Sequence, residues 1–172
     1  MAKIKTDVYA NIAFLRVTES APNTLTFAQL QMANTLMTEK AALIIHRIDW
    51  WVDGMFLTDA NGDTAAFGLS LSDRILSLVD PSAPELLAWH QFTMVYTGVP
   101  ANASIFQQPI MEDFTSLPGG GLLVPADRIY VGVKGGSLTA VSSAICRFFY
   151  TVKPLDTSDY WELIEARRIM TT

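Results

Sequence analysis

Short runs of residues that favour β-structure, separated by turn residues, recur along the chain. In the clearest of them, apolar and small or polar residues alternate, which is the pattern of a strand with one buried face. Ala65, Phe67 and Leu69 share one side of such a run, which predicts a half-buried strand. Strands are predicted at 12–18, 24–29, 42–52, 65–70, 89–96, 105–114, 128–134 and 138–152. Eight strands or slightly more favour an all-β fold of two packed antiparallel sheets.

The last of these runs carries apolar side chains on both faces. Alternation places Arg147 and Phe149 on one face, and Cys146, Phe148 and Tyr150 on the other. A strand with apolar groups on both sides and a charge among them is typical of a position near a subunit contact.

Helical patterns are fewer than strand patterns. Short helices are predicted at 32–40, 71–79 and 84–88, and the clearest helix lies at about 157–170, where Thr157, Ser158 and Asp159 are candidate N-caps. Spacings of three and four place the following residues of this last helix on one face: Tyr160, Leu163, Ile164 and Arg167. The apolar part of that face must pack on this chain's own sheet or on a neighbouring subunit.

Composition narrows the class of protein. Hydrophobic residues make up 50% of the 172 residues and charged residues only 17%, against about 25% in typical soluble proteins. The length fits one domain, 1–172, and this composition excludes disorder. The shortage of charge indicates a surface that is partly buried against other subunits, and the alternative is a monomer coated with uncharged polar residues. A net charge of -5 gives no strong nucleic-acid footprint.

Neither a secretion signal nor a membrane-spanning helix is predicted. Asp7 and Asn11 interrupt the apolar region that a signal peptide would need. The longest stretch without Asp, Glu, Lys or Arg is 86–111. It contains prolines and several polar residues, which are incompatible with a membrane helix.

Residues suited to catalysis or metal binding are sparse. His46 and His90 each lie in a strand-like run and form no pair at ligand spacing, so no zinc site and no cofactor are predicted. Cys146 is the single cysteine and lies in an apolar run, which predicts a small buried side chain. Glu112 and Asp113 are adjacent on a predicted strand, so they should point to opposite faces and form no acid–base pair.

Three segments of the chain carry a resemblance to a known family. They are FTSLPGGGLLVPADRIYVGV at 114–133, AICRFFYTV at 144–152 and DYWELIEARR at 159–168. As a set they resemble coat proteins of small icosahedral viruses, and in particular the single jelly-roll capsid proteins of environmental viruses. The resemblance implies an eight-stranded antiparallel jelly-roll sandwich with short helices in its connections and a C-terminal helix.

The same resemblance implies a role without catalysis. Many copies of such a protein self-assemble into a closed icosahedral shell around the genome, so the protein would be located in the virion after synthesis in the host cytoplasm. Six residues are expected to form subunit interfaces: Tyr160, Trp161, Leu163, Ile164, Arg147 and Phe149.

The chain departs from many such coat proteins because it lacks an Arg-rich N-terminal arm. The implied contact with the genome is therefore weak, or a second coat protein or a membrane lies between this protein and the genome. The basic residues expected to face nucleic acid are Lys3, Lys5, Arg167 and Arg168. Two other functions stay open: a trimeric spike or decoration protein of a virion, and a cupin or carbohydrate-binding jelly-roll module. The cupin function would require a titratable pocket, for which two unclustered histidines offer little.

Overall fold

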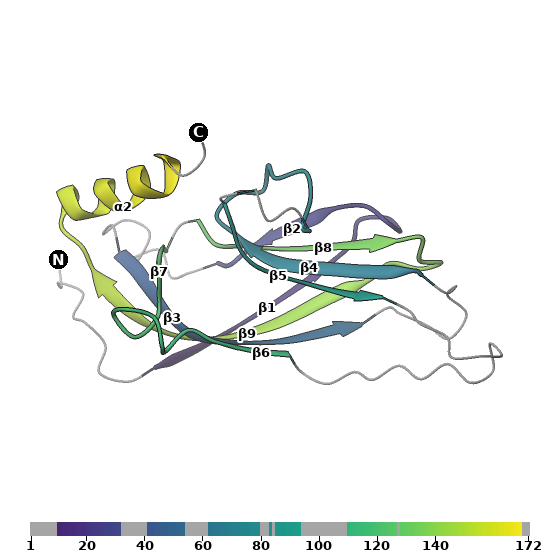
Figure 1. The fold of residues 1–172 in the computed structure, drawn as a ribbon, viewed down its shortest axis with the longest axis horizontal. Helices are drawn as coiled ribbons and strands as arrows, with labels where there is room; N and C mark the ends of the chain where they lie inside the picture. The colour runs from purple at the N-terminus through teal and green to yellow at the C-terminus, as the bar shows by residue number, and fades with distance from the viewer. Residues whose placement is uncertain are drawn as a thin grey trace.

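The computed structural model describes residues 10–31, 41–53, 62–79, 83, 85–93, 110–126 and 128–169, without the side chains of 164 and 166–169. The elements in these ranges are β1 (Asn11–Thr18), β2 (Thr26–Gln29), β3 (Ala41–Asp53), β4 (Thr64–Ser70), β5 (Leu86–Thr93), β6 (Ile110–Asp113), β7 (Leu122–Pro125), β8 (Tyr130–Gly136), β9 (Ser143–Pro154) and α2 (Thr157–Ile169). The strands form two sheets that face each other, and α2 lies at one end of the sandwich (Figure 1).

The order of the strands is that of a jelly roll. One sheet has the order β1-β9-β3-β6, with β7 also pairing with β3, and the other has the order β2-β8-β4-β5. All pairs are antiparallel, and they are nested: β1 pairs with β9, β2 with β8, β3 with β6 and β7, and β4 with β5. A long hairpin rolled into two layers gives this nesting. The prediction of an all-β jelly-roll sandwich with a C-terminal helix is confirmed.

The core lies between the two sheets and is filled from alternate positions of each strand. Trp50, Phe67 and Phe148 are the largest side chains that are completely buried there. Cys146 is also fully buried, as predicted, and lies on the same side of β9 as Phe148. Truncating a buried aromatic residue such as Phe148 to alanine costs about 3–5 kcal/mol in typical cores.

A β-bulge in β3 decides which of its residues face the core. Ile45 pairs with Tyr150 and Arg47 with Phe149, so His46 is the extra residue. The bulge reverses the alternation, and therefore Ile45 and Ile48 are both buried although three positions separate them.

The bulge also organises the segment between β6 and β7. His46 contacts the Gly120 carbonyl oxygen through Nδ1 at 2.8 Å and the Thr151 hydroxyl through Nε2 at 3.0 Å. The amide of Phe114 donates to the His46 carbonyl at 2.8 Å. Positive φ angles at Gly119 and Gly120 turn the chain before β7. β6 and β7 are thus one interrupted strand, and β7 was not among the predicted strands.

The connection after β4 corrects two predictions. Residues 71–79 form an irregular loop and not a helix, and Leu86–Ala88 begin β5 where a helical turn at 84–88 was predicted. Ile75 and Leu78 of this loop pack with Ala66 on the outer face of the β2-β8-β4-β5 sheet. β4 is therefore buried on both faces, and the expectation of a half-buried strand was wrong.

Glycine makes this close packing feasible. A Cβ atom on Gly132 of β8 would lie 2.6 Å from the ring of Phe27 and 2.8 Å from Leu78 Cδ2. The loop can approach the sheet because residue 132 carries no side chain.

The helix α2 begins at Thr157, as predicted, but its N-cap is the residue before the three predicted candidates. Asp156 accepts hydrogen bonds through Oδ1 from the Asp159 amide at 2.9 Å and from the Ser158 hydroxyl at 2.7 Å. Asp156 is therefore the N-cap, because its carboxylate holds the amide three residues further on. The helix predicted at 32–40 and the start of the strand predicted at 105–114 lie outside the described residues.

Candidate functional site

The outer face of the β1-β9-β3-β6 sheet gathers aromatic, aliphatic and arginine side chains. We call it the outer sheet face and define it by Ile12, Phe14, Arg16, Arg47, Asp49, Trp51, Met111, Ile145, Arg147 and Phe149. Ile12, Phe14 and Met111 are 60%, 63% and 62% exposed. Exposed apolar groups clustered on one face mark a site of interaction more often than isolated ones do.

The register of the sheet produces this face. Phe14 pairs with Arg147, Arg147 with Asp49, and Asp49 with Met111, so these four residues form a row across the sheet. In an adjacent row, Ile12 pairs with Phe149, and Phe149 with Arg47. Trp51 and Arg16 flank Ile145 in a third row. Alternate residues of each strand thus converge on one surface.

Asp49 lies at the centre of this face beneath two arginines. Arg47 donates to it through Nε at 2.6 Å and Nη2 at 3.0 Å, and Arg147 through Nη2 at 2.7 Å and Nε at 3.2 Å. The Asp49 side chain is only 2% exposed, whereas those of Arg47 and Arg147 are 41% and 35% exposed. One carboxylate between two guanidinium groups leaves the trio with a formal charge of +1.

Two opposing effects act on the pKa of Asp49. Burial raises this pKa, but the hydrogen bonds from Arg47 and Arg147 together outweigh burial, so the pKa lies below its usual value. Asp49 is therefore ionised at neutral pH and orients both arginines.

Aromatic rings hold the same arginines from the side. The guanidinium carbons of Arg47 and Arg147 lie 5.1 and 5.2 Å from the centre of the Phe149 ring. Arg147 also lies 5.3 Å from the centre of the Trp51 ring. Stacking and the two hydrogen bonds that each arginine makes to Asp49 leave these side chains little conformational freedom to lose on binding a partner.

The structure separates the residues that the sequence analysis placed at interfaces. Arg147 and Phe149 lie on the outer sheet face, on the side of β9 opposite Cys146, as the alternation predicted. On α2, Tyr160 is buried and Leu163 half-buried, whereas Trp161 is 52% exposed. The interface roles stay predictions.

Five nominated positions lie outside what is described. Lys3 and Lys5 fall outside the described residues, and for Ile164, Arg167 and Arg168 the side chains are not described.

A polar cluster that sequence reasoning missed links the two sheets. His90 Nε2 of β5 lies 3.1 Å from Glu112 Oε1 of β6, and Trp50 Nε1 donates to Glu112 Oε2 at 3.0 Å. Glu112 points inward, while Asp113 points outward and accepts two hydrogen bonds from Thr115, so the two acids are on opposite faces as predicted. No sequence spacing signals the His90–Glu112 contact, because it depends on how β5 and β6 meet across the sandwich.

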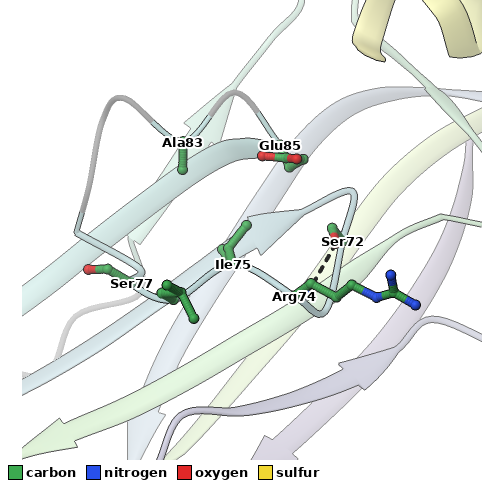
Figure 2. A pocket seen from close by; sticks show the side chains of 7 residues that line it. Ser72, Arg74, Ile75, Ser77, Ala83 and Glu85 are labelled. Atoms are coloured by element: carbon green, nitrogen blue, oxygen red, sulfur yellow. Dashed lines mark hydrogen bonds between the residues drawn. The ribbon is translucent and has the colours of Figure 1, made fainter. Parts of the chain in front are cut away.

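A small pocket lies at the loop after β4 (Figure 2). Its volume is about 260 Å³, below the range of roughly 300–1,000 Å³ typical of small-molecule sites. Its lining consists of Ser72, Arg74, Ile75, Leu76, Ser77, Ala83 and Glu85. Among the described residues that line it, none has an aromatic side chain on which a sugar could stack, and the Arg74 amide donates to the Ser72 hydroxyl at 3.1 Å.

Within the described ranges, no three His, Cys, Asp or Glu side chains gather where they could hold a metal ion. The described part of the chain likewise has no helix with the length and apolar character needed to cross a bilayer.

Comparison with known proteins gave structural neighbours only. No family model and no curated protein sequence matches the chain. A structure of Nora virus aligns with a TM-score of 0.34 and 9% identity over 88% of this chain, which spans 61% of the length of the Nora virus chain. A single-particle structure of maize chlorotic mottle virus aligns with a TM-score of 0.28 and 10% identity over 86% of this chain and 97% of that one.

Proposed function

We propose that the protein is a non-catalytic structural subunit of a virus coat, whose copies associate through the outer sheet face to form a closed shell. The observation that carries this proposal is the row Phe14–Arg147–Asp49–Met111, with Ile12, Trp51 and Phe149 beside it.

The chemistry of this face is that of a protein interface. Aromatic residues, methionine and arginine are enriched in the cores of such interfaces, and tryptophan and arginine are frequent among the residues that dominate binding energy. Phe14, Ile12 and Met111 are more than half exposed. Burying the remaining surface of each would contribute roughly 1–2 kcal/mol, since complete burial of such a side chain contributes about 1.5–3 kcal/mol.

The overall composition supports the same proposal. Charged residues are few for a chain that would keep all of its surface in water. The outer face of the second sheet is already covered by the chain's own loop through Ile75 and Leu78. The outer sheet face, where Ile12, Phe14 and Met111 are more than half exposed, is an apolar surface that a neighbouring subunit can bury.

Light scattering after size-exclusion chromatography, with electron microscopy of the largest species, tests the proposal. The chain should form closed particles of uniform size, and Phe14→Asp should raise the concentration needed for assembly by at least tenfold without lowering the melting temperature. Leu76→Asp is the matched control, because Leu76 is 91% exposed on the loop that covers the other sheet. Its assembly should be unchanged.

Other oligomeric states would point to other functions. A stable trimer would favour a spike or decoration protein, since such a protein stops at a small closed oligomer. A monomer at all concentrations and salt conditions would refute the proposal and favour a binding module.

A further inference from the structure

Helix α2 and the outer sheet face of one chain are complementary in charge and in apolar character. We propose that α2 of one copy docks through Trp161 and Glu165 on the Arg47–Asp49–Arg147 centre of the outer sheet face of the next copy. This inference rests on the proposed function, because it requires association of identical chains.

The exposed side of α2 has the chemistry that the arginine centre would bind. Trp161 and Glu165 are four residues apart and therefore lie on one helix face, with Glu162 beside them. Trp161 is 52% exposed, and both glutamates are exposed. The preceding residue, Tyr160, is buried, and the centre of its ring lies 6.1 Å from that of Trp161.

The arginine centre offers a cation within an apolar surround. Arg47 and Arg147 share the carboxylate of Asp49, which leaves this trio with a formal charge of +1, and the nearby Asp113 carboxylate offsets part of that charge on the Arg47 side. Phe14 lies on the β1 side of Arg147. Asp113 lies on the β6 side of Arg47, and its carboxylate is bound by Thr115. A carboxylate next to an indole ring matches this arrangement, because a guanidinium binds carboxylates and stacks on aromatic faces.

The helix of the same chain is placed too far round the molecule to fill this role. α2 contacts β7 and lies on the side of the β1-β9-β3-β6 sheet that carries the second sheet (Figure 1). The outer sheet face is on the other side. In the proposed docking, the helix therefore comes from a second copy.

A contact between two different surfaces of identical chains is heterologous. Repetition of such a contact gives a ring where the rotation between copies closes and an open filament where it does not, and a closed shell requires the first of these. The docking thus supplies directionality that a face-to-face dimer would lack.

Photo-crosslinking from position 161 tests the contact. A benzophenone amino acid is placed at position 161 of the full chain, and isotopically heavy and light chains are mixed before assembly and irradiation. We expect mixed heavy–light crosslinks to peptides that contain Phe14 or Trp51. Glu165→Lys should raise the concentration needed for assembly about tenfold or more, as expected for an interface charge that meets like charge.

The control is Asp73→Lys, which changes the net charge equally at an exposed position on the loop over the other sheet. It should assemble like the natural chain. Particles that form normally, with crosslinks from position 161 only to other surfaces, would overturn the docking and leave the proposed function standing. Loss of all particles in the unmodified chain would overturn the proposed function itself. A third result would also overturn the docking. If an added single-stranded oligonucleotide binds the outer sheet face and no crosslink forms between copies, the face is assigned to nucleic-acid binding.

Discussion

Glu19 is a buried carboxylate that joins two distant parts of the chain, and its replacement by glutamine should be costly. Its side chain accepts hydrogen bonds from the Gly135 amide at 2.6 Å, the Ser142 amide at 2.8 Å and the Ser142 hydroxyl at 2.9 Å. The residue is 4% exposed, and its own amide donates to the Ser142 carbonyl at 3.0 Å. It therefore fixes the turn between β8 and β9 against the end of β1.

The magnitude follows from the geometry of Glu19→Gln. Both carboxylate oxygens face a backbone amide, so either orientation of the new side-chain amide places an NH₂ group against an N–H donor. The variant loses at least one charge-assisted hydrogen bond and leaves a buried donor unsatisfied, which together cost about 2–4 kcal/mol. For a chain of this size, each kcal/mol corresponds to a shift of about 2–4 °C in melting temperature.

Urea unfolding and thermal melting measure this loss, at a concentration where light scattering gives the same species for every variant. Glu162→Gln is the matched control, because Glu162 is exposed on α2, and its change should stay within about 0.5 kcal/mol. A loss below 1 kcal/mol for Glu19→Gln would refute the reasoning, since it would mean that water or a rearranged turn satisfies the amides.

Three further predictions rest on other contacts. Burial raises the pKa of the Cys146 thiol above its usual value, so the native protein should not react with a thiol reagent at pH 8, and the unfolded protein should react at once. Because the pKa of Asp49 is lowered on folding, its ionised form stabilises the fold above the unfolded-state pKa, and this contribution is lost as the pH falls through the folded-state pKa. Asp49→Asn should thus cost about 1–2 kcal/mol at pH 7, and the difference in unfolding free energy should shrink when urea unfolding is repeated below about pH 4. Gly132→Ala should lower the melting temperature, because its Cβ would press on Phe27 and Leu78; an unchanged melting temperature would show that the loop moves without cost.

Local alternation was enough to predict most of the strands, and it failed where packing overrides it. The spacing of Ile75, Leu76 and Leu78 fits a helix, yet only Ile75 and Leu78 pack on the sheet, while Leu76 is 91% exposed. β7 was missed because a run of glycines precedes it and Pro125 ends it, both of which are signals of a loop. Its pairing partner, β3, lies some 80 positions earlier in the sequence.

The candidate site was predictable only in part for a similar reason. Alternation along β9 placed Arg147 and Phe149 on a common face. The groups that give that face its chemistry, Asp49 and Trp51, come from β3 and reach Arg147 only through the register of the sheet, 98 positions away in the case of Asp49. The alternation of inward and outward side chains along β3 also shifts at the His46 bulge. Simple alternation without the bulge would have placed Asp49 and Ile45 on the same face of the sheet.

The two outer faces of the sandwich differ in a way that bears on assembly. The chain covers one of them with its own loop, which can lie close to the sheet because Gly132 has no side chain. On the other face, three arginines and several large apolar residues lie in contact with water. The contacts of Arg47 and Arg147 with Asp49 contribute only about 1–2 kcal/mol to the stability of a lone chain, because both arginines stay partly in water. In the proposed docking, a partner would remove this pair from water and supply a carboxylate, and charge-assisted hydrogen bonds are the stronger ones in such a setting; this is the reason for assigning Arg47, Asp49 and Arg147 to association.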